Sequence, residues 1–139
     1  MKESIVRGSI LDVETGESHE MEHFLLVTGA ELTAMVNITQ VESYIHEDKS
    51  FQVSVDCLAL DSFGFVFQLN MNFTPDFIEE RDKLLRELKV DSLLITKGHY
   101  TVVENMPPFI TLHDPSYRAV PPEFSEDQIR KAFEVNKAD

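Results

Sequence analysis

The clearest pattern in the chain is an alternation of apolar and polar positions over two neighbouring runs in its middle. Residues 51–60 carry apolar side chains at every second position from Val53 onward, and residues 65–73 repeat that period beyond a predicted turn at residues 61–64. Period two is the spacing of side chains on one face of a strand. The two runs therefore predict a β-hairpin, with one apolar face and one face ending in amides that suit water or a ligand.

Further strands are predicted by shorter apolar runs on either side of the hairpin. The ranges are 4–13, 24–27, 92–103 and 109–112. A bend or bulge is expected near Gly8 in the first of these strands, and a break at Lys97 and Gly98 in the third. Residues 31–46 fit neither a helical stripe nor a clean alternation, and a strand near 35–38 is favoured there.

A helix after the hairpin is predicted by its capping residues. Thr74 is a favoured N-cap and Pro75 a favoured first helical residue, so we expect the helix to run from there to about Lys89. Phe73 and Ile78 stand at the two positions of a hydrophobic staple. The apolar residues expected to be buried are Phe77, Ile78, Leu84, Leu85 and Leu88. The ion pairs expected on the exposed face are Glu79–Lys83 and Asp82–Arg86.

A second, short helix is predicted near the end of the sequence, at about 125–135. Ser125 and Gln128 form a capping box, which marks its start. Its apolar stripe consists of Phe124, Ile129, Ala132 and Phe133. No repeat, low-complexity segment or linker divides the chain. We therefore expect a single domain over 1–139, mainly β, with a body over about 1–120 and this terminal helix.

Composition places the protein among globular, acidic chains. Its 139 residues are enough for one core, and 42% of them are hydrophobic. The net charge is -13, and it is uneven: residues 1–80 hold three basic and fifteen acidic residues. The first half should therefore repel phosphate and anionic membranes. The same charge also fits a surface that only keeps the protein soluble.

Compartment is predicted from cysteine and from apolar run length. The single cysteine, Cys57, lies in an apolar run, which predicts a buried, inert thiol and a reducing compartment. The first residues lack the apolar run of a secretory signal. No uninterrupted apolar stretch reaches the roughly 20 residues that span a bilayer. We expect a soluble, cytoplasmic protein with no membrane partner.

The order of elements resembles a known small barrel. The segments FQVSVDCLALDSFGFVFQLNMN and KVDSLLITKGHYTVVENMPPFITLHD, with the helix between them, are similar in layout to the single-stranded DNA-binding domains of the replication protein A family. The likeness covers residues 51–120 and rests on layout, because no invariant motif supports it. It implies an OB-like β-barrel with a helix between its third and fourth strands, and a groove for single strands. In that family the strand after the helix carries a glycine bend, a role that would fall to Gly98.

The resemblance also implies residues that would bind nucleic acid. Such grooves combine cations that follow phosphates with rings that stack on bases. The predicted site residues are Phe63, Phe65, Lys97, His99, Tyr100, Tyr117 and Arg118. Phe65 also lies in the apolar alternation of the hairpin, which favours a place in the core for it.

One catalytic motif occurs, at residues 19–23, which read H-E-M-E-H. On a helix, His19 and His23 would share a face and bind zinc, with Glu20 as general base. The motif instead follows a turn and runs into a predicted strand, and no third ligand stands at a recognised spacing. We therefore interpret it as an acidic loop and expect no enzyme activity, no metal and no cofactor.

Two functions from different classes remain. The first is a non-enzymatic OB-fold module that binds single-stranded nucleic acid. The second is an acidic protein-interaction module, such as an adaptor, inhibitor or nucleic-acid mimic, that binds a basic partner protein.

Overall fold

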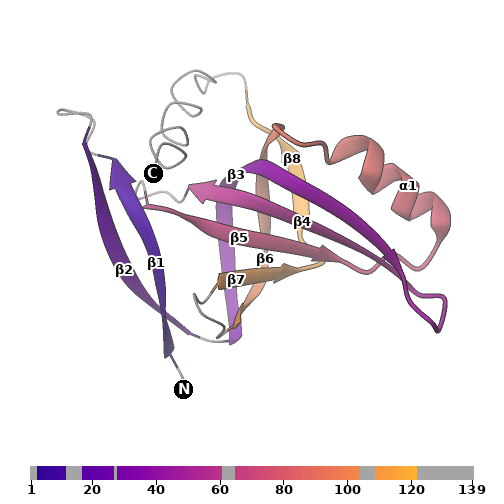
Figure 1. Cartoon of the computed structure of the whole chain (residues 1–139), viewed down its shortest axis with the longest axis horizontal. Coiled ribbons are helices and arrows are strands. Elements are labelled where there is room, and N and C mark those ends of the chain that lie inside the picture. The colour runs from indigo at the N-terminus through magenta and orange to yellow at the C-terminus, as the bar shows by residue number, and fades with distance from the viewer. Residues whose placement is uncertain (1–2, 12–16, 27, 61–64, 104–108, 122–139) are drawn as a thin grey trace.

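Strands make up most of the chain that the computed structural model describes, which comprises residues 3–11, 17–26, 28–60, 65–103 and 109–121. The elements are β1 (Glu3–Leu11), β2 (Ser18–Leu26), β3 (Thr28–Ile45), β4 (Phe51–Leu60), β5 (Phe65–Phe73), α1 (Ile78–Glu87), β6 (Leu93–Val103), β7 (Phe109–His113) and β8 (Ser116–Ala119). The predicted class, mainly β with a helix between strands, is confirmed (Figure 1). The predicted turn at 61–64 and helix at 125–135 lie outside the described residues.

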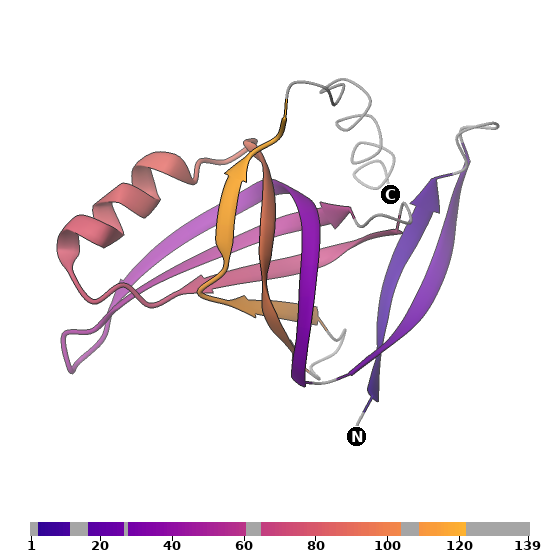
Figure 2. The ribbon, with the colours of Figure 1, turned by 180° about the vertical axis from the view of Figure 1, so that it is seen from behind.

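Five of the strands pair with one another in a ring. Antiparallel pairing joins β3 to β4 and β4 to β5. A parallel pairing joins β5 to β7, and antiparallel pairings then lead from β7 to β6 and from β6 back to β3. Helix α1 lies between the third and fourth ring strands in chain order, beside β4 and β8 at one end of the ring (Figures 1 and 2).

The remaining strands attach to the outside of this ring. The β1–β2 hairpin joins it through β1, which pairs with β5 only from Gly8–Phe67 to Ile10–Phe65. The short strand β8 pairs with β6. The sequence did not predict β8, because its four residues are mostly exposed and carry no apolar alternation.

The main core fills the inside of the ring. The predicted hairpin is confirmed, since β4 and β5 pair along their length and send alternate side chains inward. The fully buried ring residues include Val36, Val53, Val55, Ala59, Met71, Ile110 and Leu112. A second, smaller apolar cluster lies on the opposite face of the same strands, around the buried Val66, with Met35, Leu58, Leu60, Leu93 and Val120 packed against it.

The ambiguous stretch at 31–46 belongs to one long strand. The favoured strand near 35–38 is confirmed, but β3 runs from Thr28 to Ile45. Its pairing with β4 shifts register between Ile38 and Gln40. A bulge changes which residues face inward, so an alternation on one side of it does not continue on the other. This is why no single period fits the stretch.

The predicted start of the helix is wrong. Helix α1 begins at Ile78, and Phe77 is its N-cap residue, without a side-chain capping bond. The predicted cap, Thr74, instead directs its hydroxyl and its N–H to the carboxylate of Asp114. Leu88 is buried as predicted, and Leu84 and Leu85 pack against the core. Phe77 and Ile78 are exposed, contrary to the prediction.

The predicted ion pairs and strand break also need correction. Lys83 approaches Glu87 at 3.8 Å rather than Glu79. Strand β6 runs without a break through Gly98, because that residue pairs with Leu32 of β3 in unbroken register. No helix among the described residues is both long enough and apolar enough to cross a bilayer.

Candidate functional site

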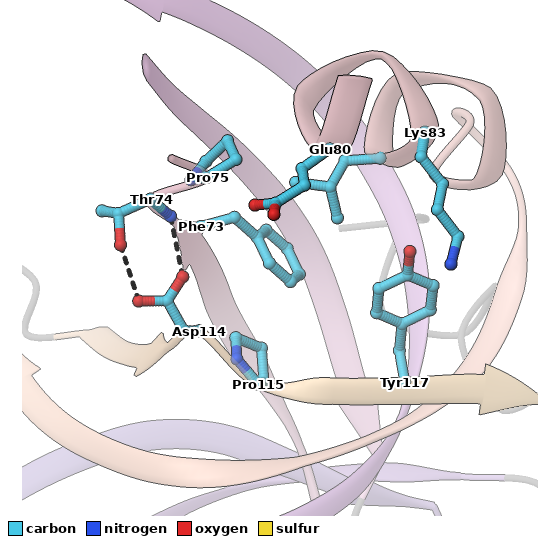
Figure 3. Close-up of a pocket in the computed structure, with 9 residues that line it drawn as sticks. Phe73, Thr74, Pro75, Glu80, Lys83, Asp114, Pro115 and Tyr117 are labelled. Atoms are coloured by element: carbon cyan, nitrogen blue, oxygen red, sulfur yellow. Dashed lines mark hydrogen bonds between the residues drawn. The ribbon is translucent and has the colours of Figure 1, made fainter. Parts of the chain in front are cut away.

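A pocket of about 310 Å³ opens between α1 and the strand ends beneath it (Figure 3). The end of β5 forms one wall and β8, with the turn before it, forms another. The lining residues are Phe73, Thr74, Pro75, Glu80, Lys83, Leu84, Asp114, Pro115 and Tyr117. Apolar side chains make the floor, while a cation and two carboxylates stand at the rim. This mixture suits a small ligand with an apolar body and a polar edge.

A carboxylate clamp fixes the wall of the pocket at the β7–β8 turn. Asp114 Oδ1 accepts the Thr74 N–H at 2.7 Å, and its Oδ2 accepts the Thr74 hydroxyl at 2.7 Å. The Asp114 N–H donates in turn to the Asn72 carbonyl at 2.8 Å. Asp114 has a φ of 44°, in the left-handed region that aspartate tolerates better than most residues. The clamp therefore joins residues forty positions apart and sets where β5 ends.

Tyr117 is the predicted site residue that lines this pocket. Its ring meets the Phe73 ring edge-on, with centroids 5.9 Å apart. Its hydroxyl donates to Glu87 Oε1 at 3.2 Å. Burial first, and then the nearby Glu87 charge, raise the pKa of Tyr117 to about 12. The phenol is therefore neutral at pH 7 and serves as a hydrogen-bond donor that links β8 to α1.

This pKa predicts how stability depends on pH in alkali. The neutral phenol is favoured in the folded state, so the contribution of Tyr117 is fully present below pH 10.0, the ordinary pKa, and is lost as pH rises toward about 12. The absorbance of tyrosinate is recorded against pH for the protein and for Tyr117→Phe. The difference between the two curves reports the ionisation of Tyr117 and should rise above pH 10.0. Circular dichroism at each pH confirms that both are folded. A difference that titrates at pH 10.0 would contradict the partly buried, hydrogen-bonded phenol.

Two of the predicted stacking residues belong to the core. Phe65 is 2% exposed and Tyr100 is 5% exposed. Phe65 stacks on Phe67, with ring centroids 5.3 Å apart, on the inner face of β5. Neither ring can reach a base in this structure, so these two assignments are corrected. Phe63 lies outside the described residues.

The polar members of the predicted site lie on one outer face. Lys97 and His99 are exposed on β6, two residues apart and thus on the same side of the strand. Arg118 on β8 is opposite Ile95, the residue two before Lys97. These three form what we call the basic row. Lys97 forms an ion pair in this row, since its ammonium lies 3.3 Å from the Glu31 carboxylate.

The amides noted in the sequence form a ladder on the outer face of β4 and β5. The Asn70 amide donates to the Ser54 hydroxyl at 2.8 Å and to Asp56 Oδ1 at 2.9 Å. The Gln52 amide donates to Asn72 Oδ1 at 2.6 Å. The ladder links β4 and β5 across their outer face. Its amides therefore have a structural role in the sheet, whether or not they also contact a ligand.

The H-E-M-E-H motif lies in a strand. Residues 19–23 fall within β2, whose residues pair one by one with β1. A strand places neighbours on opposite faces, so His19 and Glu20 cannot act together as they would on a zincin helix. No group of three metal-ligating side chains occurs among the residues that the structure describes. Residues 24–26 of the predicted strand at 24–27 form the end of β2, which begins earlier, at Ser18, while residue 27 lies outside the described residues.

The lone thiol is buried, as the sequence predicted. Cys57 is free, and its Sγ lies 3.4 Å from the Leu69 carbonyl oxygen. Burial raises the pKa of the Cys57 thiol well above its ordinary value. Because only the thiolate attacks electrophiles or metals, this cysteine is unsuited to nucleophilic chemistry.

Comparison with protein-family models, with curated proteins and with solved structures finds no match to this chain. The pocket residues Glu80, Lys83 and Asp114 were not predicted from the sequence, because they meet only through the contact of the β7–β8 turn with the end of β5. No local spacing could have marked them.

Proposed function

We propose that this chain is a non-enzymatic binding module built on an OB-type barrel, and that it binds single-stranded nucleic acid. The observation that carries the proposal is the order of the ring. Counted along the chain as one to five, the ring strands β3, β4, β5, β6 and β7 follow one another in space as one, two, three, five, four. A parallel pair of the third and fifth strands and a helix between the third and fourth also support an OB arrangement, which commonly binds oligonucleotides.

The basic row supplies the chemistry for the nucleic acid. Lys97 and Arg118 are exposed cations for phosphate. His99, two residues beyond Lys97 on the side away from Arg118, offers a ring that can stack on a base. The row stands on β6 and β8, whereas most of the acidic excess belongs to residues 1–80. Since Phe65 and Tyr100 are buried, phosphate contacts contribute more of this affinity than stacking does.

Removing both cations of the basic row should weaken binding of single-stranded DNA. Lys97→Ala combined with Arg118→Ala removes two phosphate contacts, so the slope of log affinity against log salt should flatten by about 1.4, or roughly 0.7 for each contact. Glu31→Gln should have the opposite effect, because it frees Lys97 from its carboxylate partner. Fluorescence anisotropy of a labelled, mixed-sequence single-stranded DNA at low and at moderate salt measures both.

The control is Lys89→Ala, which removes an exposed cation beyond the end of α1 and should leave binding unchanged. Saturable binding that weakens with salt and responds to these variants supports the proposal. A flat titration at low salt would reject it, and so would equal losses in the Lys89 variant and the double variant.

A basic protein partner is the second candidate function. The net charge of -13 favours it, as do the exposed apolar side chains of Phe77 and Ile78 at the start of α1.

A further inference from the structure

The first turn of α1 exposes large apolar side chains that the pattern of the sequence assigns to the core. Phe77 is 63% exposed and Ile78 is 47% exposed, and Ile45 at the end of β3 is 62% exposed. Single exposed apolar residues are ordinary, but neighbouring ones rimmed by polar groups mark interaction sites. A common interaction site requires that these three side chains belong to one surface.

Contacts around Phe51 place them together. Ile45 is the strand partner of Phe51, and the Arg81 guanidinium lies over the Phe51 ring, 5.4 Å from its centroid. The Arg81 N–H donates to the Phe77 carbonyl at 3.1 Å, which places Phe77 one helical turn before Arg81. Ile45 is therefore the strand neighbour of the Phe51 ring, and Phe77 lies one helical turn from the Arg81 that covers this ring. We call Ile45, Phe77 and Ile78 the apolar patch.

Carboxylates lie close to the apolar patch along the chain. Those on and just before the first turns of α1 are Asp76, Glu79, Glu80 and Asp82, and those in the β3–β4 loop are Glu47 and Asp48. The cations nearby are fewer. Arg81 has its side chain engaged with Phe51 and with Asp82 Oδ1 at 3.1 Å, and Lys83 lies 3.8 Å from the Glu87 carboxylate. Lys49 is exposed in the β3–β4 loop. The six carboxylates outnumber these three cations, so the rim carries a net negative charge around an apolar centre.

We propose that the apolar patch docks a basic amphipathic segment of a partner protein. The apolar side of such a segment would cover Phe77, Ile78 and Ile45, while its Lys and Arg side chains would meet the surrounding carboxylates. For the second candidate function, binding of a basic protein, the apolar patch would be the binding site and a basic amphipathic segment the ligand. The patch is separate from the basic row on β6 and β8.

Charge argues against the other occupants of an exposed apolar surface. A second copy of this chain would bring the same carboxylates to the contact, and like charges facing each other across an interface cost binding energy. Nucleic acid and anionic membranes would meet the same repulsion. A cationic partner is the one whose approach these carboxylates accelerate.

The test uses synthetic peptides with the full-length protein. The probe is a labelled helical peptide of about 18 residues, roughly five turns, with Leu at i, i+3, i+4 and i+7 spacing and Lys elsewhere. One control peptide replaces every Lys by Glu, and another replaces every Leu by Ser. Anisotropy should show saturable binding of the first peptide alone, with an association rate that falls as salt rises.

Matched variants locate the site. Phe77→Ser combined with Ile78→Ser should weaken binding of the Lys–Leu peptide at least about tenfold, because buried apolar anchors carry most of the energy of an interface. Val90→Ser is the control, since Val90 is 60% exposed just beyond the same helix and should change nothing. Because the substituted residues are exposed, both variants should remain folded, which circular dichroism checks.

Three results would overturn the proposal: no saturable binding, equal binding of the Lys–Ser peptide, and equal losses in the Val90 variant and the double variant. The first is an absence of affinity, and the second is attraction by charge alone. The third places the peptide elsewhere on the protein. None of them bears on single-stranded DNA, whose titration depends on the Lys97 and Arg118 variants.

Discussion

Leu112→Ala should lower the free energy of unfolding by about 2–5 kcal/mol, the range for leucine truncation in a packed core. Leu112 is fully buried on β7, the strand that closes the ring. It is opposite Met71 on the parallel side and Tyr100 on the antiparallel side. Truncation leaves a cavity beside β7, whose pairings with β5 and with β6 are both needed to close the ring. Urea denaturation followed by circular dichroism measures the loss.

Two controls separate the packing effect from other causes. Leu112→Met keeps the volume and should cost less than about 1.5 kcal/mol. Val90→Ala truncates an exposed apolar side chain and should change stability by no more than about 0.5 kcal/mol. If Leu112→Ala cost no more than the methionine variant, β7 would not be part of the cooperative core, and the five-stranded ring would lose its closing strand.

The parts of the fold that could be predicted from the sequence are those whose information is local. The alternation over residues 51–60 and 65–73 sets both the pairing of β4 with β5 and the side that faces the core. The same alternation favoured a core position for Phe65 over a base-stacking one, and Phe65 is buried in the structure. Tyr100 follows the same rule on β6, where Thr96 and Val102 are also buried.

The start of the helix could not be predicted in this way, because distant residues decide it. Thr74 has the side chain of a good N-cap, and capping rules weigh only its neighbours. Asp114, forty residues later, accepts both of its donors, and the backbone of Phe77 is still non-helical. The helix therefore begins late, and Phe77 and Ile78, which local rules assign to its buried face, lie in the exposed apolar patch.

The candidate sites follow the same division. Lys97, His99 and Arg118 share an outer face because strand parity and the β6–β8 register place them there. Parity is readable from the sequence, whereas the β8 pairing is not, since four mostly exposed residues carry no pattern. The pocket under α1 depends on the clamp of Asp114 on Thr74, so its lining could be found only in three dimensions.

Gly98→Ala should destabilise the protein by about 1–3 kcal/mol, the usual cost of overpacking a well-packed site. A Cβ added at Gly98 would lie 3.0 Å from Pro115 Cβ and 3.1 Å from Pro115 Cα. Those atoms belong to a backbone and a rigid ring, so they cannot move aside as a flexible side chain would. The sequence suggested that Gly98 bends the strand. The structure indicates instead that it lets the buried Pro115 approach an unbroken β6.

The sign of this effect distinguishes the two explanations. Where an added Cβ fits, glycine to alanine stabilises a protein by about 0.4–1 kcal/mol, because it restricts the unfolded chain. A double-mutant cycle with Pro115→Gly tests the contact directly, since removing the Pro115 Cβ should make Gly98→Ala less costly by more than about 0.5 kcal/mol. Chemical denaturation of the four proteins gives that coupling. An equal cost in both backgrounds would mean that the strand itself, rather than the turn carrying Asp114 and Pro115, requires glycine at this position.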